Sequence, residues 1–104
     1  MTPLVPEPLM VDLQEGALKD VPFTVLDPSK CVRAVATGAK EVKELHLQIM
    51  DRSDHVHGED ELPGAIALAN LHGPICFTSP GQYRAVVQLV EGSGKVAVQV
   101  WQAE

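Results

Sequence analysis

The pattern of apolar residues near the end of the chain constrains the fold more than any other feature. In residues 84–90 and again in residues 95–101, apolar and β-branched side chains alternate with a period of two, which is typical of strands with one buried face. A glycine-rich turn, Glu91-Gly92-Ser93-Gly94, separates the two runs. We therefore expect a β-hairpin that closes an antiparallel sandwich. The inward positions in this interpretation are Tyr83, Ala85, Val87, Leu89, Val96, Val98 and Val100.

Shorter alternating runs occupy the rest of the chain. They predict further strands over residues 9–13, 21–25, 31–37, 43–50 and 76–78. Residues 43–50 also fit a helical period through Leu45 and Ile49, but their strict alternation favours a strand. Residues 65–71 fit either a strand or a helix, and residues 51–64 lack a pattern and are expected to form a loop. The sequence therefore predicts an all-β fold, an antiparallel β-sandwich of about eight short strands.

Size and charge exclude several classes of protein. The 104 residues suffice for one domain with a modest core. Aromatic residues make up 4% of the chain, so Val, Leu, Ile and Ala must fill that core. The net charge of −6, with eight scattered Lys and Arg, disfavours nucleic acid and anionic membrane surfaces as partners. No apolar stretch approaches the ~20 residues of a membrane span, so we expect no membrane insertion.

The beginning of the chain differs in composition from the rest. Residues 1–8 are rich in proline and are expected to form an extended tether ahead of a single sandwich domain, residues 9–104. They lack the basic start and the apolar core of a signal peptide. We therefore expect either a protein that stays inside the cell or a mature domain placed behind an added Met1.

Two cysteines, Cys31 and Cys76, stand far apart in the sequence and match no zinc or CxxC spacing. The residues themselves leave two interpretations open. Both thiols could be free and buried in a cytosolic protein. Alternatively, a disulfide could join two strands, which through the entropy of loop closure would add about 4 kcal/mol to the free energy of unfolding.

Residues 51–61 concentrate the candidate metal ligands. His55 and His57 are two positions apart, so an extended chain would point both to one face, where a transition metal could bind. Carboxylates could instead bind calcium, which prefers oxygen ligands. Neither set has the fixed spacing of a metal signature, so we expect a solvated acidic loop without a bound ion. The calcium candidates are Asp51, Asp54, Glu59 and Asp60.

No arrangement of residues predicts catalysis. A nucleophile needs a nearby base and a group that orients the base, and the serines lie in turns without a nucleophile elbow. His72 and Cys76 are close enough in sequence to approach each other, but no Asn or Asp accompanies them as an orienting group. We therefore expect no catalytic residues.

Two aromatic residues of the closing segment are expected to differ in role. Trp101 shares the outward register of Lys95 and Gln99. There it would either cover the edge of the sheet or anchor a binding partner, as exposed Trp often does. Tyr83 shares the inward register and is expected in the core, with its hydroxyl group bonded at the rim.

Three segments of the chain carry a family resemblance. In order, they are VDLQEGALKDVPFTV, KELHLQIMDRSD and SPGQYRAVVQLVEGSGKVAVQVW. They resemble the two opening strands, the central strand with its Asp-rich turn, and the closing strands of the bacterial pre-peptidase C-terminal domain family. The resemblance implies a jelly-roll-like β-sandwich of the kind found as an accessory domain on secreted enzymes and surface proteins.

The cysteines extend this resemblance to domains of secreted or lipoprotein-type proteins from predatory and social, myxobacteria-like Gram-negative bacteria. In those domains the two cysteines are expected to pair, so the resemblance implies a disulfide between Cys31 and Cys76. The acidic segment departs from the family, because residues 51–61 are longer and richer in His than the usual short turn. A ligand site of the family is therefore not carried over to this chain.

We expect a non-enzymatic accessory module of an extracytoplasmic protein, whether periplasmic, in the cell envelope or secreted. The module would bind a protein or polysaccharide partner or stabilise a neighbouring domain. No cofactor is expected, and calcium is the one candidate. The alternative is a cytoplasmic interaction or assembly subunit, which the lack of a signal peptide favours.

Overall fold

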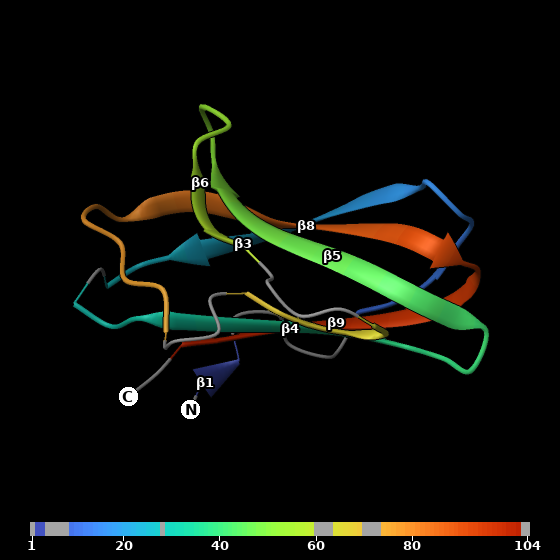
Figure 1. The fold of residues 1–104 in the computed structure, drawn as a ribbon. Helices are drawn as coiled ribbons and strands as arrows, with labels where there is room; N and C mark the ends of the chain where they lie inside the picture. The colour runs from blue at the N-terminus through green and yellow to red at the C-terminus, as the bar shows by residue number, and fades with distance from the viewer. Residues whose placement is uncertain (1, 4–8, 28, 60–63, 70–73, 103–104) are drawn as a thin grey trace.

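A computed structural model describes residues 2–3, 9–27, 29–59, 64–69 and 74–102. Two antiparallel sheets face each other and form a sandwich (Figure 1). This described part contains no helix, and therefore none that could span a membrane. The predicted all-β sandwich is confirmed.

The first sheet, sheet A, contains five strands of the described chain. These are β1 (Thr2–Pro3), β2 (Leu9–Leu13), β4 (Val32–Gly38), β7 (Ile66–Leu68) and β9 (Gly94–Gln102). Strand β9 lies in the middle, with β1 and β2 along one side of it and β4 along the other, and β7 pairs with the far side of β4.

The second sheet, sheet B, contains four strands of the same described part. These are β3 (Leu18–Val25), β5 (Val42–Asp51), β6 (Val56–Glu59) and β8 (Gly81–Gly92), in the order β3-β8-β5-β6. From β2 to β9, every connection except the β5–β6 hairpin passes from one sheet to the other. This is the strand order of a jelly roll.

Aliphatic side chains fill the space between the sheets. Strands β5, β8 and β9 contribute the inward residues of their alternating patterns, and each of these strands buries every second side chain over most of its length. Tyr83 is buried as predicted, and its hydroxyl group donates a hydrogen bond to the carbonyl oxygen of Ser79 at 2.7 Å. The largest fully buried side chains are Leu45, Leu47, Ile49, Leu89, Val25, Val32, Val87, Val96, Val98 and Val100.

The predicted closing hairpin is wrong. Strand β8 pairs with β3 and β5 in sheet B, whereas β9 pairs with β1, β2 and β4 in sheet A. Only Ser93 separates the two strands, and the positive φ angles of Gly92 (93°) and Gly94 (137°) carry the chain across the sandwich. Alternation shows which side of a strand faces the core but not which strand is its partner, so a hairpin and a crossover have the same pattern.

Other segments differ from expectation in smaller ways. The predicted strand over residues 76–78 is absent, and only Ile75 forms a bridge, with Val32. The predicted loop over residues 51–64 contains β6, an exposed edge strand that lacks an alternating pattern because no face of it is buried. Residues 43–50 form a strand as predicted, and in residues 65–71 the described part forms β7.

The predicted tether falls largely outside the described residues. Thr2 and Pro3 pair with the end of β9, opposite Gln102 and Trp101, respectively. Residues 4–8 lie outside the described part, so the boundary between a tether and the domain stays a prediction.

Cys31 and Cys76 form a disulfide, with 4.3 Å between their Cα atoms. The neighbouring residues Val32 and Ile75 exchange two backbone hydrogen bonds, each of 2.7 Å. The cysteines therefore form the adjacent antiparallel pair, in which no hydrogen bonds are exchanged and Cα atoms come closest. The disulfide joins the beginning of β4 to the segment that precedes β8.

We predict that the unreduced protein contains no free thiol and that reduction lowers the free energy of unfolding by about 2–5 kcal/mol, because the bond restricts the unfolded chain. Thiol titration in denaturant and urea unfolding with and without reductant measure the two quantities. The double variant Cys31→Ser/Cys76→Ser is the control, since reductant should leave its stability unchanged. Two titratable thiols in the unreduced protein would contradict this prediction.

Candidate functional site

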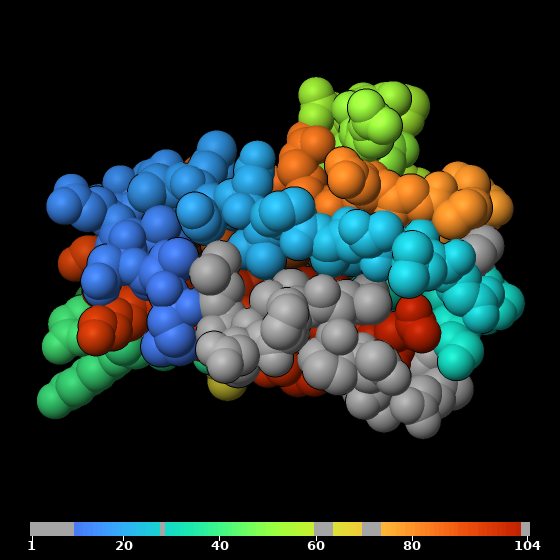
Figure 2. Space-filling view, turned by 180° about the vertical axis from the view of Figure 1, so that it is seen from behind, coloured from blue at the N-terminus to red at the C-terminus, as the bar shows by residue number. Residues whose placement is uncertain are grey.

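The turn between β5 and β6 projects from the sandwich above sheet B (Figures 1 and 2). Asp51 ends β5, and one of its carboxylate oxygens, Oδ1, accepts the backbone N–H groups of Ser53 at 2.8 Å and His55 at 3.0 Å. Asp54 adopts a left-handed conformation, with φ of 65°, which Asp tolerates better than most residues. The side chain of Asp51 thus organises the turn that follows it.

A β-bulge places His57 beside Asp51. Ile49 pairs with Gly58 and Met50 with Val56, so His57 is the extra residue on β6. Bulges of this kind redirect a side chain. The imidazole Nε2 of His57 lies 3.0 Å from the second carboxylate oxygen of Asp51, Oδ2.

Aromatic rings hold the imidazole of His57 at the end of the core. The ring centroids of Phe77 and Tyr83 lie 5.4 Å and 5.5 Å from that of His57. Phe77 and Tyr83 are themselves 4.1 Å apart, and Phe23 packs against both. His57 therefore has one side against this aromatic cluster and its edge on a carboxylate.

The hydrogen bonds to Asp51 favour its ionised form. The bond with His57 lowers the pKa of the Asp51 carboxyl group most, and the backbone N–H groups of His55 and Ser53 lower it further. The imidazole Nδ1 of His55 lies 3.5 Å from the same Oδ2 atom that His57 contacts. Asp51 is thus a carboxylate whose lone pairs are mostly occupied within the protein.

Arg84 fastens the projecting turn to sheet B. One guanidinium nitrogen, Nη1, donates to the backbone carbonyl of Asp51 at 3.0 Å, and another, Nη2, pairs with the carboxylate of Asp54. Its Nε lies 3.9 Å from the carboxylate of Asp20 on β3. The hydrogen bond with Asp54 raises the pKa of Arg84 above its usual value. Sequence reasoning missed Arg84, because only the pairing of Met50 with Arg84 brings it to this turn.

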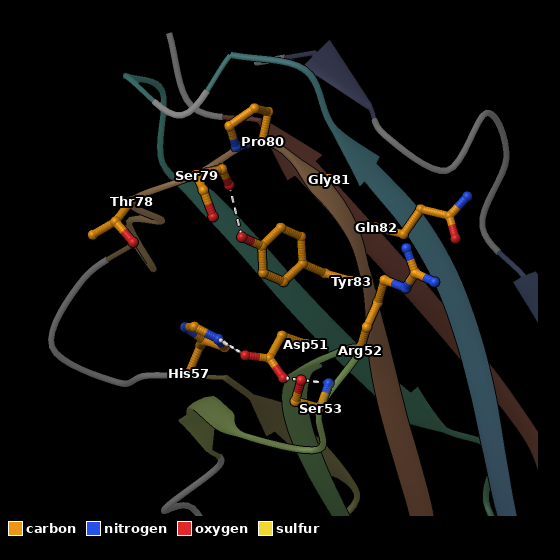
Figure 3. Close-up of a pocket in the computed structure, with 10 residues that line it drawn as sticks. All are labelled: Asp51, Arg52, Ser53, His57, Thr78, Ser79, Pro80, Gly81, Gln82 and Tyr83. Carbon is orange, nitrogen blue, oxygen red and sulfur yellow. Dashed lines mark hydrogen bonds and ion pairs between the residues drawn. The ribbon is translucent and has the colours of Figure 1, made fainter.

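A surface pocket of about 340 Å³ lies beside the Asp51–His57 pair (Figure 3). Residues 51–53, His57 and residues 78–83 line it. The hydrogen bond from Tyr83 to Ser79 fixes one part of the rim. The contacts of Asp51 fix the opposite part, so the pocket lies between two braced segments.

The predicted metal ligands only partly come together. His55 and His57 do approach one atom, the Oδ2 of Asp51. Asp54 instead pairs with Arg84, Glu59 bonds to His46 at 2.9 Å, and Asp60 lies outside the described residues. Within the described ranges, no three His, Cys, Asp or Glu side chains are arranged to hold a metal ion. Both ligand sets stay predictions.

The remaining predicted site residue, Trp101, lies on β9 and is half-buried on the outer side of sheet A, where it pairs with Arg33 of β4. Its role with a partner stays a prediction.

In the pocket, the structure shows no Ser or Thr hydroxyl bonded to His57 among the described residues, and both cysteines are in the disulfide. The lining of the pocket includes hydroxyl, amide and guanidinium groups, which form hydrogen bonds.

We predict that Asp51→Asn lowers the free energy of unfolding at neutral pH. The difference in free energy of unfolding between this variant and the unsubstituted protein should become smaller in acid. A depressed pKa stabilises the fold above the ordinary value of 3.8, and that stabilisation is lost as the pH falls toward the lower folded-state pKa. Urea midpoints measured across this range test the prediction, with Asp12→Asn on exposed β2 as the control. An equal difference at every pH would contradict it.

We also predict that neither calcium nor zinc at millimolar levels changes the melting temperature. A bound ion would raise the free energy of unfolding by RT ln(1 + [L]/Kd). Thermal unfolding with each ion tests both ligand sets. A zinc-dependent rise that is lost in His55→Ala/His57→Ala, or a calcium-dependent rise that is lost in Asp54→Asn, would show that a site exists.

This chain is similar in structure to several proteins whose structures have been solved. No family model matches the chain, and no curated protein does. The pre-peptidase C-terminal domain of collagenase from Bacillus anthracis is similar at a TM-score of 0.66 and 16% identity, over 90% of this chain and 87% of that one.

Two glycosidases show weaker similarity. A family GH115 4-O-methyl-α-glucuronidase, BtGH115A, has a TM-score of 0.49 and 13% identity, over 99% of this chain and 16% of its own. The arabinose-bound α-L-arabinofuranosidase MgGH51 has a TM-score of 0.39 and 11% identity, over 97% of this chain and 20% of its own. The similarity to the collagenase domain supports an assignment of fold: the chain has the β-sandwich fold seen in a pre-peptidase C-terminal domain.

Proposed function

We propose that this chain is a non-enzymatic accessory module of a secreted or cell-envelope protein. In this role it binds a protein or polysaccharide partner or stabilises a neighbouring domain. The observation that carries the proposal is the fold shared with the C-terminal domain of a collagenase over most of both chains. Because one fold can serve many functions, the surface of this chain must supply the binding residues.

The disulfide supports an extracytoplasmic location. Such bonds persist in oxidising compartments and are rare in the cytosol. Cys76 is exposed to solvent, so a reducing environment would reach the bond. The alternative, a cytoplasmic assembly subunit, requires two reduced thiols in the protein isolated from its own cells.

Two surfaces could serve binding, and they lie on different sheets. Trp101 is on the outer side of sheet A, and the pocket lies beside the turn of sheet B. Trp side chains dominate many interfaces because they bury a large rigid area. Trp101 is therefore the residue through which we expect an extended partner to bind.

We predict that the protein is retained by at least one member of a panel of insoluble polysaccharides and fibrous proteins that includes collagen. Trp101→Ala should weaken that retention by about 30-fold, as expected for loss of an anchoring Trp. Sedimentation isotherms measure it. Gln99→Ala, two residues away on the same outer face, is the control. Failure of the whole panel to retain the protein would contradict a binding role.

A further inference from the structure

The pocket beside Asp51 presents polar groups that the protein does not use. The side chains of Thr78, Gln82 and Arg52 line it and are exposed. Within the described part of the chain, none of these three side chains has a hydrogen-bond or ion-pair partner. In the view of Figure 3, Thr78 lies with His57 on one side of the Tyr83 ring, and Arg52 lies beside Gln82 on the other.

The contact between His57 and Asp51 defines what the imidazole offers a ligand. Nε2 faces the carboxylate, so in the neutral ring Nε2 carries the proton. Nδ1 is then an acceptor, and the side chain is 30% exposed. The pocket therefore offers the imidazole of His57, the hydroxyl group of Thr78 and the amide of Gln82, which both donate and accept, and the guanidinium donors of Arg52.

The charge of the pocket favours a neutral ligand. Among its lining residues, Asp51 carries one negative charge and Arg52 one positive charge, so the formal charges of these two side chains cancel. The carboxylate of Asp51 is already bonded to His57, Ser53 and His55, so little of its charge is available to a cation. An apolar ligand is disfavoured as well, because most of the side chains that line the pocket are polar.

Volume and shape limit the size of the ligand. About 340 Å³ is near the lower end of the range of small-molecule pockets, so the pocket suits a single ring of a small molecule. Sugar hydroxyl groups both donate and accept hydrogen bonds, which matches a lining that contains both donors and acceptors.

We infer that this pocket binds one neutral hexose or pentose residue of a glycan chain. The inference rests on the proposed binding function and specifies its ligand class. His57 and Thr78 would contact hydroxyl groups on one side of the ring, and Gln82 and Arg52 on the other. Asp51 would not touch the sugar and would position His57.

Titration of the isotope-labelled full chain with free glucose, galactose, xylose and arabinose, followed by NMR, tests the inference. We expect shifts of the backbone amides of His57 and of residues 78–83, except Pro80, which has no N–H group, and these shifts should saturate in the millimolar range for at least one neutral sugar. Glucuronic acid and glucosamine should bind at least tenfold more weakly. Gln82→Ala should weaken binding about tenfold, as loss of a hydrogen bond to the ligand implies, whereas Gln88→Ala, on the same strand outside the pocket, should not.

The possible outcomes separate this inference from the proposed function. Absence of shifts at the pocket with every neutral sugar would overturn the inference, as would tighter binding of either charged sugar. So would equal binding by Gln82→Ala and the unsubstituted protein. If an insoluble partner still retains the protein through Trp101, the binding function stands while the sugar pocket falls.

Discussion

The burial of aliphatic side chains between the two sheets is the interaction on which the rest of the structure depends. The chain contains only four aromatic residues other than His, so Val, Leu and Ile fill the centre. Leu47 and Ile49 of β5 face the core from sheet B, and Val98 of β9 faces it from sheet A, each with no exposed surface. Removing such surface from water is the main favourable contribution to folding. Once these faces are fixed, the intervening side chains must point outward.

Three of these four aromatic residues, Phe23, Phe77 and Tyr83, gather at one end of this aliphatic layer, and the pocket lies beside them. Phe23, Tyr83 and Asp51 lie in one row across β3, β8 and β5, because Tyr83 pairs with both of the others. The row brings a carboxylate to the rim of a ring cluster. The bulge in β6 then brings His57 to the same place. The site therefore lies at the polar end of the core, and the same packing stabilises both the site and the fold.

The strands and their inward faces could be predicted because alternation is a local property. The partners of β8 and β9 could not, since a hairpin and a crossover bury the same residues. In the site, residue type pointed to Asp51 and His57, and their close contact followed from no pattern in the sequence. Thr78, Gln82 and Arg84 were missed because they come from β8 and the segment before it, which only sheet pairing brings to the turn.

The jelly-roll strand order has a consequence for how the chain folds. Strand β9 lies between β2 and β4 in sheet A, and β8 lies between β3 and β5 in sheet B. Neither sheet is complete until β8 or β9, the last two strands of the described chain, has paired with strands from the first half of the chain. Pairings between strands so far apart in the sequence are slow to form, and the earlier strands keep unpaired edges until β8 and β9 join them. We therefore expect the domain to fold as a whole only after residues 81–102 have been synthesised.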